Sequence, residues 1–124
     1  MKIIATIARI LLGLMFVVFG SNAFLHFIPM PPQKPGLATD FSTALFVSHY
    51  FYVVAILQIT GGALCLAGRF VPLGLTLLGP VIVNILLFHI FLERNGLPMA
   101  LVVSALALIV LWDRRSSFAG LLKP

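Results

Sequence analysis

The sequence predicts an all-α fold, a four-helix transmembrane bundle with both termini in the cytoplasm. Of the 124 residues, 61% are hydrophobic and only 9% are charged, whereas an average soluble domain is about a quarter charged. The apolar residues also fall into four long segments, each near the roughly 20 residues that a helix needs to cross a bilayer. A hydrophobic soluble oligomer is the alternative, but a chain this small has too few polar residues to face water.

The four predicted spans cover residues 3–27, 43–67, 73–92 and 98–113, and they form a single membrane domain over residues 1–124. The first segment is too long for the apolar core of a secretory signal and contains Arg9, so we interpret it as a span. The fourth span is short. We expect it to extend through residues 113–115 at the headgroups, with Trp112 as an interfacial anchor.

The connection between the first two spans is rich in residues that end helices. Residues 29–36 hold four prolines and a glycine, which predicts an irregular external loop. We expect Thr39, Asp40 or Ser42 to cap the helix that follows, because their side-chain oxygens can accept from the first backbone N–H groups.

Proline also marks the later connections. Residues 68–72 predict a tight turn, with Pro72 in the first position of the next helix. Residues 93–98 predict the last turn. Inside the third span, Pro80 has no N–H to donate, so we expect a kink there.

The basic residues predict which ends face the cytoplasm. One side of the membrane holds both termini and the second connection, with six basic residues against two on the other side. Cytoplasmic segments carry the excess of lysine and arginine, so both termini are predicted to be cytoplasmic. The six are Lys2, Arg9, Arg69, Arg114, Arg115 and Lys123, and the two are Lys34 and Arg94. The net charge of +5 does not indicate nucleic-acid binding, because no basic run exceeds two residues.

Polar side chains inside the spans are informative, because each costs free energy in hydrocarbon unless it has a partner. Counting about 1.5 Å per residue from the middle of each span places Gln58, Asn84 and Ser104 near the midplane. We interpret these three as helix-packing residues that form hydrogen bonds between neighbouring helices.

A second polar group lies about 10 Å nearer the external side, by the same count. It consists of three pairs: Asn22 with His26, His49 with Tyr52, and His89 with Glu93. The members of each pair are three or four residues apart, so they share a helix face. If these faces turn inward, the bundle holds a polar pocket that opens toward the external loop.

Three interpretations of this outer pocket stay open. It can bind a quinone head group by donating hydrogen bonds to the carbonyls. It can move protons through His89 and Glu93, since histidine titrates near neutrality. The side chains can also be interfacial packing residues, with apolar bodies and polar tips. We single out His89, because the Glu93 carboxylate can hold the tautomer of its ring.

Other kinds of site are not indicated by the sequence. A metal site is conceivable, but three histidines of unknown geometry are weak evidence for one, so no metal ligand is predicted. No GxSxG, HExxH, Walker or Rossmann motif is present, so no catalytic residue is predicted. A small transporter or channel is a further alternative, which a lone Arg9 and one His–Glu pair favour only weakly.

Several stretches are more specific than their apolar surroundings: RILLG at residues 9–13, FGSN at 19–22, GGAL at 61–64, GRFVPL at 68–73 and PVIVNILLFH at 80–89. Together, over residues 3–118, they resemble the DoxX family of small four-helix bacterial membrane proteins. The resemblance implies a multi-pass protein of the bacterial cytoplasmic (inner) membrane. Some DoxX-like proteins belong to redox systems, including a thiosulfate:quinone oxidoreductase and a complex tied to thiol and superoxide defence. Many members carry an acidic residue near the position of Gln58.

We therefore expect a non-catalytic accessory subunit of a membrane redox or envelope complex, with quinone or lipid as the candidate ligand of the outer pocket. The alternative is a membrane subunit of a quinone-linked oxidoreductase in which His89 and Glu93 handle protons. The expected partners are membrane lipids, together with other membrane-protein subunits or further copies of this chain.

Overall fold

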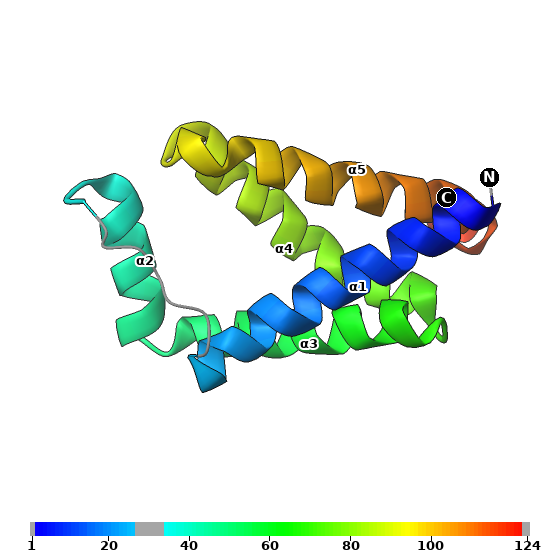
Figure 1. The fold of residues 1–124 in the computed structure, drawn as a ribbon, viewed down its shortest axis with the longest axis horizontal. Coiled ribbons are helices and arrows are strands. Elements are labelled where there is room, and N and C mark those ends of the chain that lie inside the picture. The colour runs from blue at the N-terminus through cyan, green and yellow to red at the C-terminus, as the bar shows by residue number, and fades with distance from the viewer. Residues whose placement is uncertain (1, 27–33, 123–124) are drawn as a thin grey trace.

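The computed structural model describes residues 2–26 and 34–122. Over these residues the chain forms α1 (Lys2–Leu25), α2 (Leu37–Val47), α3 (Tyr50–Ala67), α4 (Val71–Phe91) and α5 (Leu97–Asp113), with the 3-10 helices η1 (Arg94–Gly96) and η2 (Arg115–Leu122) after α4 and α5 (Figure 1). Four stretches are long and apolar enough to cross a membrane, namely α1, α3, α4 and η1 with α5. The predicted bundle of four apolar helices is confirmed.

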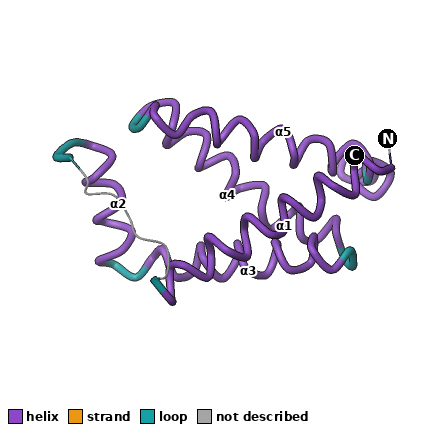
Figure 2. Tube along the Cα trace, viewed as in Figure 1, coloured by secondary structure: helices purple, strands orange, loops and turns teal. Residues whose placement is uncertain are grey.

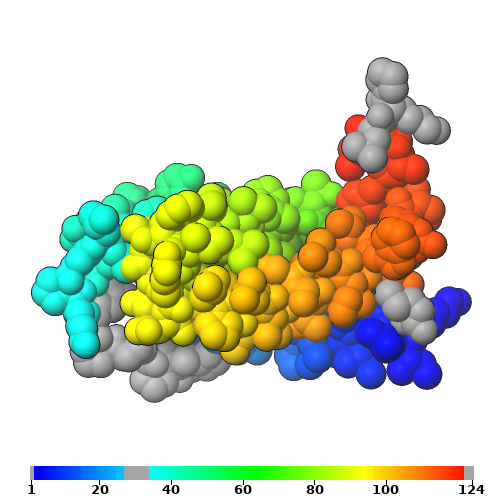
Figure 3. Space-filling view, turned by 90° about the horizontal axis from the view of Figure 1, so that it is seen from above, coloured from blue at the N-terminus to red at the C-terminus, as the bar shows by residue number. Residues whose placement is uncertain are grey.

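The four long helices form a closed ring in the order α1, α3, α4, α5. Helix α1 packs against α3 and α5, and α4 packs against the same two helices from the other side. Short turns join α3 to α4 and α4 to α5 (Figure 2). The start of α1 and the whole of η2 lie at one end of the bundle, whereas α2 lies at the opposite end (Figures 1 and 3).

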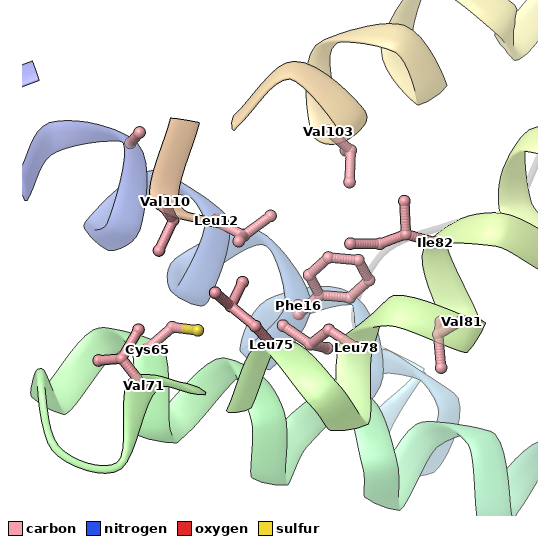
Figure 4. Packing of buried hydrophobic residues seen from close by; sticks show 11 residues of the cluster. Leu12, Phe16, Cys65, Val71, Leu75, Leu78, Val81, Ile82, Val103 and Val110 are labelled. Carbon is pink, nitrogen blue, oxygen red and sulfur yellow. The ribbon is translucent and has the colours of Figure 1, made fainter. Parts of the chain in front are cut away.

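The core is made by aliphatic side chains from all four helices. Leu12 and Phe16 of α1 point toward Leu78 and Ile82 of α4, and Val103 of α5 lies above them (Figure 4). The opposite faces of the helices carry exposed apolar side chains, which suit contact with lipid tails. Two adjacent glycines of α3 contact two different helices: Gly62 packs against α1 and Gly61 packs against α4.

The second predicted span, residues 43–67, is wrong as one continuous helix. The chain breaks between α2 and α3 at Ser48 and His49, and His49 has a left-handed backbone with φ of 64°. The Ser48 hydroxyl oxygen accepts from the Tyr50 N–H at 3.3 Å. A serine side chain that bonds a nearby backbone group offers the chain an alternative to the helix. Helix α2 has 11 residues, about 16 Å, and is too short to cross the bilayer.

The predicted cap of this region is also wrong. Helix α2 begins at Leu37 with Gly36 at its N-cap and no side-chain cap, so Thr39, Asp40 and Ser42 lie inside it. The Thr39 hydroxyl donates back to the carbonyl oxygen of Lys34 instead. Most of the predicted proline-rich loop, at residues 27–33, lies outside the described residues. In the third span, Pro72 takes the second helical position rather than the first, after Phe70 at the N-cap.

Arg9 has a structural contact that the sequence did not indicate. Its guanidinium reaches from α1 to the C-terminal end of α3 and donates to the carbonyl oxygens of Cys65 and Leu66. The last carbonyls of a helix have no partner within the helix, and a cation there also complements the helix dipole. Arg9 therefore fastens α1 to the end of α3, close to Gly68.

A cavity lined by Gln58 and His89

A cavity of about 130 Å³ lies between the four long helices. Its lining comes from α1, α3, α4 and α5, and it is mostly apolar, with two polar side chains among the residues that form it. The residues are Met15, Phe16, Phe19, Gln58, Ile85, His89, Met99, Ala100 and Val103. Apolar walls with a few polar groups are typical of small-molecule sites. This cavity is the candidate site.

His89 is held in one orientation at the edge of this cavity. Its Nδ1 lies 2.9 Å from the backbone carbonyl oxygen of Glu93. The ring packs edge-on against Phe88, with 5.1 Å between the centroids. On another side it meets Gly96, where an added Cβ would lie 2.3 Å from the imidazole Cε1. A side chain at position 96 would collide with the imidazole, so the ring can lie in this place only because residue 96 is a glycine.

The predicted role of the Glu93 carboxylate is wrong. Helix α4 ends at Phe91, so His89 and Glu93 are not an i,i+4 pair on one helix face. The carboxylate Oε1 of Glu93 accepts from the backbone N–H of Asn95 at 3.0 Å and caps η1. The tautomer of His89 is fixed by the backbone of Glu93, through its carbonyl oxygen.

Gln58 is the other polar residue of the cavity, and its side chain is 7% exposed. Its Oε1 is buried and has no hydrogen-bond partner among the described residues. A buried acceptor without a partner costs about 1–3 kcal/mol, and such groups in native structures call for an explanation. The prediction that Gln58 forms a hydrogen bond to a neighbouring helix is therefore wrong for its side-chain oxygen.

Asn84 and Ser104, the other two predicted packing residues, form hydrogen bonds within their own helices. The amide of Asn84 donates to the carbonyl oxygen of Pro80 at 2.9 Å. The hydroxyl of Ser104 donates to the carbonyl oxygen of Ala100 at 2.8 Å. Neither of these bonds joins two helices. Asn84 is exposed on the outer face of α4.

The remaining predicted ligand residues lie elsewhere. His49 stacks on Tyr52 with 5.6 Å between the ring centroids, and Tyr52 stacks on Phe24 of α1 at 5.1 Å. His26 follows the end of α1 with φ of 51°, and its N–H donates to the carbonyl oxygen of Asn22 at 2.9 Å. Of the six predicted ligand residues, the cavity lining includes His89. Within the described part of the chain no group of three potential ligands is placed to hold a metal ion.

The four spans and the cavity between them define a multi-pass integral membrane protein. No family model, no curated protein and no solved structure matches the chain.

Proposed function

We propose that this protein is a DoxX-like membrane subunit that holds a small amphipathic molecule, a quinone head group or a lipid, in the cavity between its four spans. The observation that carries the proposal is the buried Oε1 of Gln58, which has no partner in the part of the chain described. It lies on a side chain that lines the cavity together with His89. Polar groups in a largely apolar cavity are what fix a ligand's orientation.

The accessory role follows from the small extramembrane mass. Outside the spans the described chain offers α2, η2 and short turns. Most of its surface is apolar helix, so its contacts are with lipid and with other membrane proteins or further copies. The inner membrane of a bacterium, with both termini cytoplasmic, is the location we propose from the basic residues and the family resemblance.

The alternative, in which His89 and Glu93 pass protons in an oxidoreductase, gains no support from their contact. His89 is bonded to a carbonyl oxygen of the backbone, and a peptide carbonyl has no proton to give. The carboxylate is engaged by the N–H of Asn95.

The proposal is tested by purifying the protein in mild detergent and identifying its bound small molecules by mass spectrometry and visible absorption. Wild type is compared with His89→Ala and with Asn84→Ala, a matched change on the outer face of the same helix. We expect a small molecule that is retained by wild type and Asn84→Ala and lost from His89→Ala. Equal content in all three proteins, or none in any, contradicts the proposed function.

A further inference from the structure

We propose that the outer face of α4 is the contact between two copies of this chain, in which the Asn84 side chains of the two copies bond to each other across a twofold axis. The inference stands apart from the proposed function, because the cavity lies among the four long helices of one copy. A dimer formed through α4 can therefore exist with or without a ligand in the cavity.

The first observation is the place of Asn84 in the span. It is exposed and lies three residues beyond Val81, the middle residue of α4, which is about 4.5 Å from the centre of the helix. Its neighbours on this face, Val83 and Leu87, are exposed apolar side chains that suit lipid. Hydrocarbon offers an amide no hydrogen-bond partner, so a polar side chain at this depth is favoured where it faces another helix.

The second observation is that the hydrogen bond within α4 uses only part of the Asn84 amide. One N–H donates to the carbonyl oxygen of Pro80 at 2.9 Å. A carboxamide has two N–H groups and an acceptor oxygen, so a donor and Oδ1 stay available on the outer side of the helix. Because the same group carries both a donor and an acceptor, two facing amides can bond to each other.

The membrane makes a second copy the partner that supplies this complement. Copies inserted with one topology hold each residue at the same depth, so α4 packed on α4 is a parallel contact in which Asn84 faces Asn84. A twofold contact of this kind uses the same patch on both copies. A partner of unrelated sequence needs a polar residue of its own at that depth, whereas a further copy always brings one.

The helix surface beside Asn84 has room for a second helix. A Cβ on Gly79 would meet nothing within 4 Å, so the glycine faces away from the bundle and the surface is open there. Small residues at such a place let the backbones of two membrane helices approach closely. The short side chain at Gly79 thus allows the approach, and the amide of Asn84 gives it a specific hydrogen bond.

Cross-linking in membranes tests which face meets a second copy. Val83→Cys on α4 and Val102→Cys on α5, each on a Cys65→Ala background, are the matched pair. Both valines are exposed, by 54% and 51%, and each lies within about 5 Å of the middle of its helix. Oxidation with copper phenanthroline joins two cysteines only where they come close together. We expect Val83→Cys to form a disulfide-linked dimer and Val102→Cys to give only the small amount that random collision produces.

The role of the amide is measured by energy transfer in vesicles, over a range of protein-to-lipid ratios. Copies carry a donor or an acceptor dye at Ser116→Cys, outside the spans. We expect Asn84→Leu to dimerise about tenfold more weakly, which corresponds to about 1.4 kcal/mol, and Asn84→Gln to recover part of the loss because it keeps the amide. Thr60→Val, which removes an exposed hydroxyl from α3, is the control and should dimerise as wild type does.

Three results overturn the inference. The first is a protein that stays monomeric at every ratio, with Val83→Cys linked no more than Val102→Cys. The second is an Asn84→Leu variant that dimerises as wild type does, because the amide then does not join the copies. The third is a cross-linked product of Val83→Cys whose mass is not twice that of the chain, which places a different membrane protein on this face. None of them affects the proposed function, whose test is the retention of a small molecule by the cavity.

Discussion

Gly13 of α1 and Gly62 of α3 face each other so closely that neither position has room for a side chain. A Cβ on Gly13 would lie 2.6 Å from the carbonyl oxygen of Gly62, and a Cβ on Gly62 would lie 2.9 Å from the carbonyl oxygen of Gly13. The obstacle on each side is backbone, which cannot turn away as a side chain can. Membrane helices pack through such small residues because lipid gives no hydrophobic drive for them to associate.

Gly13→Ala is expected to destabilise the bundle by about 1–3 kcal/mol, the usual cost of overpacking a tight contact. Gly120→Ala is the control, because a Cβ there would have nothing within 4 Å. It should leave the stability unchanged or raise it by up to about 1 kcal/mol, since alanine favours a helix. Reversible unfolding in mixed micelles measures both. Equal stabilities would contradict the close approach of α1 and α3.

Arg9→Met is expected to lower the stability by about 1.5–3 kcal/mol, because the hydrogen bonds from a charged group to the carbonyl oxygens of Cys65 and Leu66 are lost. Arg9→Lys should restore part of the loss, and the exposed Arg69→Met serves as the control for removal of a charge at this end. The measurement is again unfolding in micelles. If Arg69→Met lowers the stability as much as Arg9→Met does, the loss of stability comes from the change in net charge and not from the contact with α3.

Gln58→Leu is expected to leave the unliganded protein as stable as wild type or more stable, by about 1–3 kcal/mol, since a buried acceptor without a partner is removed. Gln58→Ala removes the same acceptor and enlarges the cavity, so it should destabilise by comparison. A loss of stability in Gln58→Leu would mean that the amide ties helices together after all.

Glu93→Gln is expected to keep ligand binding within about twofold of wild type, because the backbone carbonyl that holds His89 is unchanged and an amide oxygen can still cap Asn95. Gly96→Ala should lose binding as His89→Ala does, because its Cβ would displace the imidazole. Gly120→Ala, where a Cβ meets nothing, is the control. Loss of binding in Glu93→Gln would restore the role of the carboxylate.

The orientation of the protein is checked with single cysteines on a Cys65→Ala background, using exposed positions near opposite ends of the bundle. We expect Asn95→Cys to react with a membrane-impermeant maleimide on intact cells. Ser116→Cys should react only after the membrane is permeabilised. The reverse pattern would place both termini outside the cytoplasm, against the distribution of lysine and arginine.

The four spans could be predicted from the sequence because length and hydropathy alone determine which segments can cross a bilayer. The break at His49 could not be predicted, since no proline or glycine marks it. The local signal is one serine hydroxyl, on Ser48, which accepts a hydrogen bond from the Tyr50 N–H. The burial of Gln58 and the lining position of His89 depend on how α3 and α4 are rotated toward each other. A spacing of three or four residues shows only that two side chains share a face.

The prediction that the Glu93 carboxylate holds His89 is wrong because sequence spacing does not show where the helix ends. The sequence places a carboxylate four residues after His89, and an uninterrupted helix would bring the two side chains together. In the structure α4 ends two residues before Glu93, so the carboxylate turns to cap η1 and the backbone takes its place beside the imidazole. The end of a helix is the part of a sequence-based prediction that is least certain.

The closed order of the helices has a consequence for biosynthesis. Helix α1 has α3 and α5 as its neighbours, and of these four spans α5 is synthesised after the other three. Until then α1 packs against α3 and meets α4 only through core side chains, and the cavity has no wall on the side of Met99 and Val103. The bundle, and any capacity to retain a ligand, is therefore completed only after residue 113 enters the membrane, so a nascent chain halted in the last turn is an open three-helix intermediate.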